Sequence, residues 1–133
     1  AKLLIVHADD LGVIHGVNQA SFKAMEEGSV SSASIMVPTP WLPEVAAYAK
    51  ANPDHDMGIH LTLTSEWQLL RIGPVASRSE VSSLLNENGY FYPDCGELWE
   101  HAKIEEVEIE LRAQIDKAIA MGINPTHLDT SGH

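Results

Sequence analysis

Short apolar runs alternate with helical patterns along this chain, and this alternation constrains its fold more than any other feature. The runs at 2–7, 31–37 and 57–63 have the length of strands buried on both faces, and a shorter one follows at 126–129. Chains with this order usually build parallel sheets through right-handed helical crossovers. We therefore predict an α/β fold in which parallel strands alternate with helices.

Helical patterns fill the intervals between these runs. Residues 17–27 and 43–51 are rich in helix formers, and each segment ends at a glycine or an Asn-Pro pair. The clearest helix is predicted over 104–121, where apolar residues repeat every three or four positions. The glutamates of this segment, Glu110 among them, lie mostly off the apolar stripe.

The segment 65–95 has no sustained period and is longer than an ordinary connection between elements. It contains Gly-Pro and Asn-Gly pairs, which are typical of turns. We interpret it as a functional loop or an irregular insertion. No linker divides the chain, so residues 1–133 are predicted to form a single domain.

Composition limits the classes of partner. Eight Lys and Arg residues stand against 19 Asp and Glu, a formal net charge of −11 that argues against nucleic-acid or anionic-membrane surfaces. No apolar run approaches the ~18 residues of a membrane span, and no secretory signal is evident. The single cysteine, Cys95, excludes an internal disulfide and a multi-cysteine metal site. We expect a cytoplasmic protein with neither nucleic acid nor membrane as partner.

Aspartates and histidines gather where the predicted strands end. His7, Asp9 and Asp10 come at or just past the end of the first run, His60 lies toward the end of the third, and His127 is in the fourth. Ligands and catalytic groups collect at the carboxyl ends of parallel strands. Taken singly, the acidic pair is equally well explained as a cap, and each histidine is better explained as a hydrogen-bonded core residue. Together they favour a site for Zn²⁺ or another first-row divalent ion, with Mg²⁺ also open.

Three sequence blocks resemble the signature of a known family. They are 7–12 (HADDLG), 58–64 (GIHLTLT) and 125–129 (PTHLD), and they look like the blocks of the YdjC-like carbohydrate deacetylases. This family includes chitooligosaccharide deacetylase and is related to the polysaccharide deacetylases. The resemblance implies a partial (β/α) barrel of the polysaccharide-deacetylase-like type. It also implies metal-dependent removal of acetyl groups from N-acetylated amino-sugar oligosaccharides.

The resemblance assigns roles to several residues of these blocks. Asp10 and His60 are expected to be metal ligands, and Asp9 is expected to be the neighbouring catalytic carboxylate, which accepts a proton from the attacking water. His127 belongs to the block that brings the third ligand. We predict that it protonates the leaving amine.

One position departs from the family pattern. The family's third ligand is a histidine two residues after Asp129, and here Ser131 occupies that position. On chemical grounds His133 is predicted to supply the third ligand instead; alternatively, residues 131–133 stand in place of the native continuation. Family members are also markedly longer. We therefore expect an N-terminal half of a barrel, which either self-associates or pairs with the missing half.

Two alternatives differ in class from an enzyme. A non-catalytic or degenerate fragment that binds sugar or metal is suggested by Ser131 and by the short chain. A phosphorelay receiver domain has nearly this length and an acidic pair after its first strand. Against the receiver, the third run offers no aspartate to accept phosphate, and no lysine follows a late strand.

Overall fold

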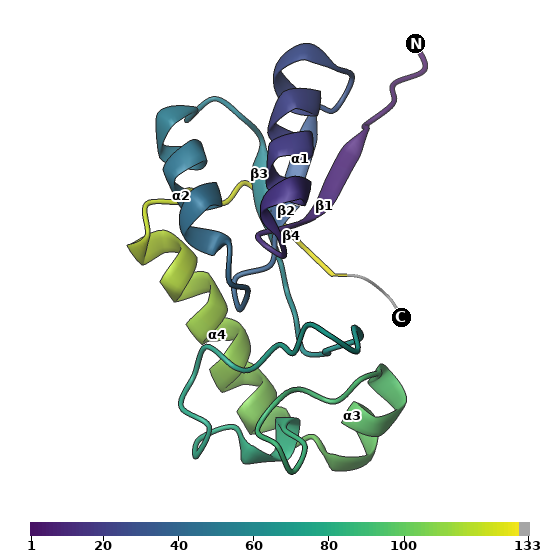
Figure 1. Ribbon diagram of the computed structural model, residues 1–133, viewed down its shortest axis with the longest axis vertical. Helices are drawn as coiled ribbons and strands as arrows, with labels where there is room; N and C mark the ends of the chain where they lie inside the picture. Colours follow the sequence, from purple (N-terminus) through teal and green to yellow (C-terminus); the bar gives the residue numbers. More distant parts are fainter. Residues whose placement is uncertain (131–133) are drawn as a thin grey trace.

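The computed structural model describes residues 1–130, and a four-stranded sheet lies at its centre (Figure 1). The strands are β1 (His7–Leu11), β2 (Ser32–Ile35), β3 (Met57–His60) and β4 (Leu128–Asp129). They follow the order β1-β2-β3-β4, and every neighbouring pair is parallel, so the predicted α/β fold is confirmed. A receiver domain has the order 2-1-3-4-5, which excludes that alternative. Consecutive order is typical of a (β/α) barrel wall, whose closure stays a prediction.

Helices cover one face of this sheet. They are α1 (His15–Glu27), α2 (Leu42–Ala51) and α4 (Ile104–Ala120), close to the three predicted ranges. Alternate strand residues point toward them because successive side chains of a strand face opposite ways. None of the helices within residues 1–130 combines the length and apolar character needed to cross a bilayer. The core between sheet and helices is built from Leu11, Phe22, Ala33, Ile35, Leu42, Val45, Ile59 and Ala118.

The first predicted strand is displaced along the chain. Residues 1–6 lie outside any strand, and Leu3 and Leu4 are 94% and 85% exposed. The reason is the length of the neighbouring strand: β2 begins at Ser32, which pairs with His7, so the earlier residues extend past their partner. The prediction that residues 2–7 form a buried strand is therefore wrong for most of that run.

The long segment after β3 is more ordered than its sequence indicated. It contains a 3₁₀ turn, η1 (Ser82–Leu84), and leads into a helix that was not predicted, α3 (Cys95–His101). The Asp94 side chain caps α3 by accepting a hydrogen bond from the Glu97 N–H at 2.9 Å. Figure 1 shows this segment and α3 gathered around the first half of α4. A second apolar cluster holds them, formed by Val13, Met36, Ile72, Val81, Leu84, Leu85 and Phe91.

The face that α4 buries agrees with the predicted stripe only in part. Ala118 is completely buried, but Ile104 and Ile119 at the ends of the stripe are 71% and 55% exposed. Glu110 and Gln114, which lie off the stripe, are completely buried. The cause is the surface on which α4 packs. That surface includes the backbone of Thr62 and of the long loop, whose polar groups need hydrogen-bond partners once they are removed from water.

The sheet is strongly curled. In a flat sheet, β1 and β4 would be separated by three strand spacings of about 4.8 Å each, too far for a His and an Asp side chain to meet. Yet His7 Nε2 on β1 lies 2.9 Å from Asp129 Oδ2 on β4. The face opposite the helices is therefore concave, and its side chains converge.

Candidate functional site

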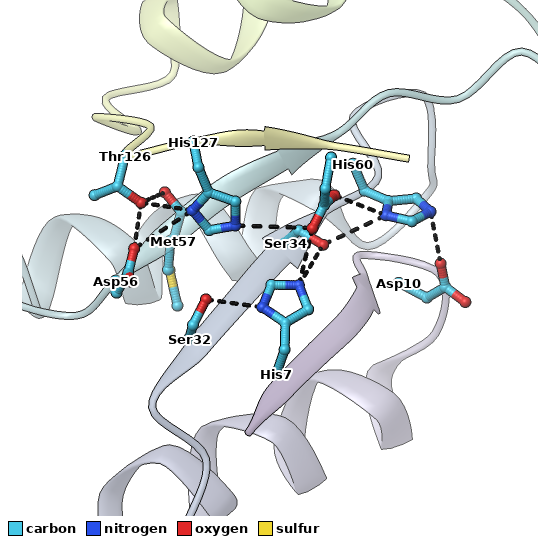
Figure 2. A network of polar contacts seen from close by, with 10 residues as sticks. His7, Asp10, Ser32, Ser34, Asp56, Met57, His60, Thr126 and His127 are labelled. Atoms are coloured by element: carbon cyan, nitrogen blue, oxygen red, sulfur yellow. Dashed lines mark hydrogen bonds and ion pairs between the residues drawn. The ribbon is translucent and has the colours of Figure 1, made fainter. Parts of the chain in front are cut away.

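Polar side chains occupy the concave face of the sheet. In β2 and β3 they alternate with the apolar residues that face the helices, which gives the pattern Ser-Ala-Ser-Ile in β2. Figure 2 shows the imidazole rings on this face, with His127 toward Asp56, His60 toward Asp10, and His7 beside Ser32 and Ser34. The polar residues of this face are His7, Ser32, Ser34, His60, His127 and Asp129.

His60 lies between two carboxylates and is 3% exposed. Its Nδ1 is 2.9 Å from Asp129 Oδ1, and its Nε2 is 3.4 Å from Asp10 Oδ1. A carboxylate only accepts hydrogen bonds, so Nδ1 must carry the hydrogen that is donated to Asp129. A neutral ring then presents an unprotonated Nε2 to the Asp10 carboxylate. A cation between His60 Nε2 and Asp10 Oδ1 would stabilise these two lone pairs at so short a distance. Metal-binding histidines usually donate the hydrogen of their other nitrogen to a carboxylate, as His60 Nδ1 does to Asp129.

A β-bulge places the acidic pair. Ala8 pairs with Ala33 and Leu11 with Ile35, so β1 carries one more residue than β2 over this stretch. Asp10 has a φ of 60°, an uncommon conformation for a residue other than glycine. The extra residue and the left-handed turn let Asp9 and Asp10 both line the same cleft. Backbone strain of this kind is concentrated at functional sites in proteins.

The electrostatics of the acidic pair favour a bound cation. Burial raises the pKa of Asp10 above 3.8, and the neighbouring negative charge of Asp9 raises it further, while His60 opposes the shift. Ionised Asp10 is therefore held at a cost in this chain. A divalent cation at this position would offset that cost, because it favours the charged form of the carboxyl group.

A cleft of about 380 Å³ opens at the site. Its polar lining includes Asp9, Asp10 and His60, together with Glu66 from the long loop. The rest of the lining is mostly apolar and includes the exposed indole of Trp99 on α3. A few polar groups in a mostly apolar cleft are the usual form of a small-molecule site. The apolar wall consists of Trp67, Leu98, Trp99, Ile104, Val107 and Leu111.

A buried polar pair on α4 fixes one side of this cleft. The Glu110 carboxylate accepts hydrogen bonds from the N–H groups of Val75 and Ala76, each at 2.9 Å. Gln114 exchanges two hydrogen bonds with the backbone of Thr62, at 3.0 and 2.6 Å, and also donates to Glu110 at 2.8 Å. Thr62 itself lines the cleft. The pair therefore ties α4 both to the segment after β3 and to the long loop.

The structure brings some of the predicted site residues together and separates others. Asp9, Asp10 and His60 meet at the cleft. His127 is not among the residues that line it; its ring lies over Gly58, where an added Cβ would come within 2.5 Å of the imidazole. His133, the predicted third ligand, and Ser131 lie outside the described residues.

Two groups in the site were not recognised from the sequence. His7 was placed at the end of the first strand, but it begins β1 and contacts Asp129, a residue to which no role had been given. The alternation of serine with apolar residues in β2 was the signal for a polar inner face. Glu110 and Gln114 stand four positions apart, the spacing of neighbours on one helix face, but their burial depends on what α4 packs against.

Comparison with protein families gives one assignment. A family model described as "YdjC-like protein" matches residues 3–133. A carbohydrate deacetylase of Thermus thermophilus is 41% identical over 96% of this chain and 43% of its own length. A chitooligosaccharide deacetylase of Yersinia enterocolitica is 34% identical over 99% of this chain and 50% of its own length. The chain thus spans about half the length of the curated relatives that it matches.

A solved structure agrees with these matches. The crystal structure of an Enterococcus faecalis protein named for cellobiose-phosphate cleavage superposes with a TM-score of 0.84 and 33% sequence identity. The superposition covers 96% of this chain and 47% of that one. The sequence and structure comparisons therefore agree that this chain corresponds to about half of a longer protein.

Proposed function

This chain belongs to the YdjC-like protein family, and on that premise we propose that the whole protein is a carbohydrate deacetylase. Its relatives are named carbohydrate deacetylase and chitooligosaccharide deacetylase. More specifically, we propose a metal-dependent hydrolase that removes the acetyl group from N-acetylated amino-sugar oligosaccharides. Mg²⁺ and Zn²⁺ are the candidate ions, and the experiment below tests both.

One observation supports this proposal above the others. His60 Nε2 and Asp10 Oδ1 face each other at 3.4 Å in the lining of the cleft, and Asp129 contacts the other nitrogen of the imidazole. These two atoms would be two ligands of the ion. The remaining ligands are assigned to water and substrate, or to residues outside 1–130.

The reaction would use the acidic pair in two different ways. Asp10 and His60 would hold a divalent ion, which makes water a stronger nucleophile at neutral pH and stabilises negative charge on the acyl oxygen. Asp9 would accept the proton of the water that attacks the acetyl carbon. The carbon–nitrogen bond then breaks, giving acetate and an amine that needs one proton. Asp9 lines the cleft and His127 does not, so the geometry favours Asp9 over the sequence-predicted His127 as the donor of that proton.

The apolar wall of the cleft suits the rest of the substrate. Sugar rings have apolar faces that stack on exposed indoles, and Trp99 is 82% exposed while Trp67 is 37% exposed. Both rings line the cleft that begins at Asp9. We therefore assign the sugar units beyond the acetylated one to this wall.

The test is acetate release from N-acetylglucosamine oligomers, measured with Mg²⁺, with Zn²⁺ and after chelation. We expect release with at least one ion, loss of release on chelation, and recovery when the ion returns. Asp9→Asn should abolish turnover while leaving sugar binding measurable, and Asp116→Asn on the outer surface of α4 is the matched control. Release that survives both chelation and Asp10→Asn would contradict the mechanism.

A second candidate function is favoured by one residue of the sequence. Because Ser131 stands at the position of the family's third metal ligand, the protein would bind metal and sugar without turnover. The same assay separates the two functions. Sugar binding that depends on the ion, with no acetate released by any metal-loaded form, would support the binding function and contradict the enzyme.

A further inference from the structure

We propose that His7, His127 and Asp129 form a second divalent-metal site, suited to Zn²⁺ and separate from the Asp10–His60 pair. The proposal goes beyond the deacetylase function and does not depend on it. His7 is on β1, while Asp129 ends β4 and His127 directly precedes that strand. The curl of the sheet brings their side chains to the middle of the concave face.

The three side chains each offer one ligand atom to a common point. His7 Nε2 is 2.9 Å and His127 Nε2 is 3.7 Å from Asp129 Oδ2, and all three ligand atoms lie within 4.8 Å of one another. Zinc–nitrogen bonds of about 2.0–2.1 Å in a tetrahedron require ligand atoms about 3.3 Å apart. The two distances to Asp129 Oδ2 lie on either side of this separation, so the three atoms are spaced as ligands of one ion can be.

Hydrogen bonds determine which nitrogen of His127 is free. The Thr126 hydroxyl donates to the Asp56 carboxylate, with the Met57 carbonyl as a second acceptor at 3.1 Å. A hydroxyl has one hydrogen, so Thr126 Oγ1 can only accept from His127 Nδ1, 2.8 Å away. Nδ1 therefore carries the hydrogen. In the neutral ring, Nε2 then carries no hydrogen, and its lone pair is directed toward Asp129.

The other two ligands have equivalent support. His7 Nδ1 is 2.7 Å from the Ser32 hydroxyl, which can accept its hydrogen, and Nε2 has Ser34 Oγ at 3.0 Å as its other neighbour. Asp129 Oδ1 accepts from His60 Nδ1 at 2.9 Å, which leaves Oδ2 for the ion. Metal-binding histidines and carboxylates are generally held in this way by partners on their far atoms.

The donor set selects the class of ion. Two imidazoles and one carboxylate make an open three-ligand site, an arrangement found with zinc and with other first-row divalent metals. Mg²⁺ prefers oxygen ligands and should bind weakly here. Because the ligands come from the first and last strands of the sheet, an ion would also link its two edges and stabilise the folded chain.

This site is tested by titrating the metal-free protein with Zn²⁺ and with Co²⁺. Calorimetry measures the number of ions bound, and the absorption of Co²⁺ reports its ligands. We expect one equivalent to be lost in the double variant His7→Gln/His127→Gln and to be retained in the matched surface variant His101→Gln. The Asp10→Asn variant should keep this equivalent and lose only the one assigned to Asp10 and His60. The two proposals can therefore fail independently: either metal equivalent can be absent while the other is present. A double variant with unchanged stoichiometry would overturn the second site.

Two further measurements cover the case in which the double variant does not fold. In the wild-type chain, Zn²⁺ should shift the Nε2 resonances of His7 and His127 in nitrogen NMR spectra while Nδ1 of His127 stays protonated; unshifted Nε2 resonances would overturn the site. Asp56→Asn removes only the negative charge that lies beside Thr126 and His127 Nδ1. It should weaken Zn²⁺ binding by about 10- to 100-fold, and unchanged binding would contradict the role given to this charge.

Discussion

Asp10 combines a left-handed backbone, partial burial and a negatively charged neighbour in one residue. Its φ of 60° and its raised pKa both indicate that this position is not optimised for the stability of the metal-free chain. His60 and Asp129 supply the reason for retaining it, because they aim an imidazole nitrogen at its carboxylate. At the residue scale, the site is a set of individually unfavourable groups that a cation would make compatible.

Replacing Asp10 with asparagine should stabilise the metal-free chain at neutral pH. The folded-state pKa of Asp10 is raised above 3.8, so the destabilisation is absent well below pH 3.8, grows as pH rises from 3.8 to the folded-state pKa, and is constant above it. Asparagine tolerates the left-handed backbone, so the gain should be less than about 1 kcal/mol, limited by solvent screening of this partly exposed carboxyl.

Melting temperatures measured from pH 3 to pH 8, with Asp116→Asn on the exposed side of α4 as the control, check this prediction. The difference between Asp10→Asn and wild type should vanish at the acidic end. Added Zn²⁺ should reverse the order at neutral pH, because only the wild type retains both ligands of the Asp10–His60 pair. A variant less stable than wild type in the absence of metal would contradict this interpretation of Asp10.

Replacing Gly58 with alanine should destabilise the chain and displace His127. An added Cβ would lie 2.5 Å from the His127 ring and 2.6 Å from its carbonyl oxygen. Overpacking of this kind costs about 1–3 kcal/mol. Gly16→Ala is the matched control, since nothing lies within 4 Å of its new methyl group and helix α1 should gain stability. Urea unfolding measures both; an equally stable Gly58→Ala variant would show that the strand spacing adjusts.

Helix α4 shows how one element serves both packing and the site. Its apolar stripe predicted the helix but not the burial of Glu110 and Gln114, because the surface beneath it is partly polar backbone. Glu110 and Gln114 satisfy that backbone, and in doing so they attach the long loop and Thr62 to the helix. At the element scale, these two side chains fix the position of the cleft wall.

Truncating Glu110 to alanine should release this attachment. The change leaves the Val75 and Ala76 N–H groups without their carboxylate, and loss of the partner of a buried donor costs about 1–3 kcal/mol. Glu108→Ala, on the exposed side of the same helix, removes only an ion pair with Arg112 and should cost less than about 1 kcal/mol. Hydrogen exchange should accelerate at the Val75 and Ala76 amides in the first variant alone. Unchanged protection there would contradict the attachment.

The whole molecule is a curled parallel sheet with helices on its convex side and polar groups on its concave side. Within residues 1–130, β1 and β4 each pair on one side only. Leu3, Leu4 and Ile5 beside β1 are 94%, 85% and 75% exposed, and Leu128 in β4 is 53% exposed. Unpaired strand edges next to exposed apolar side chains favour association with another chain or segment.

This 133-residue chain should therefore self-associate in solution. Sedimentation velocity across a range of concentrations should show species larger than the monomer. Ile5→Glu should shift the distribution toward monomer by placing a charge beside the β1 edge, whereas Leu69→Glu, at a fully exposed loop position, should not. A wild-type chain that is monomeric at every concentration would contradict this prediction.

The sequence by itself determined the class of fold and singled out Asp9, Asp10 and His60, which line one cleft. Periodicity specified parallel strands and helices because burial repeats with the geometry of each element, and the blocks around Asp9, Asp10 and His60 are local in sequence. Only the tertiary structure decided which face of α4 is buried, that residues 1–6 lie outside the sheet, and that His7 meets Asp129. These features depend on which segments become neighbours, and the curl of the sheet brings together side chains more than 120 residues apart.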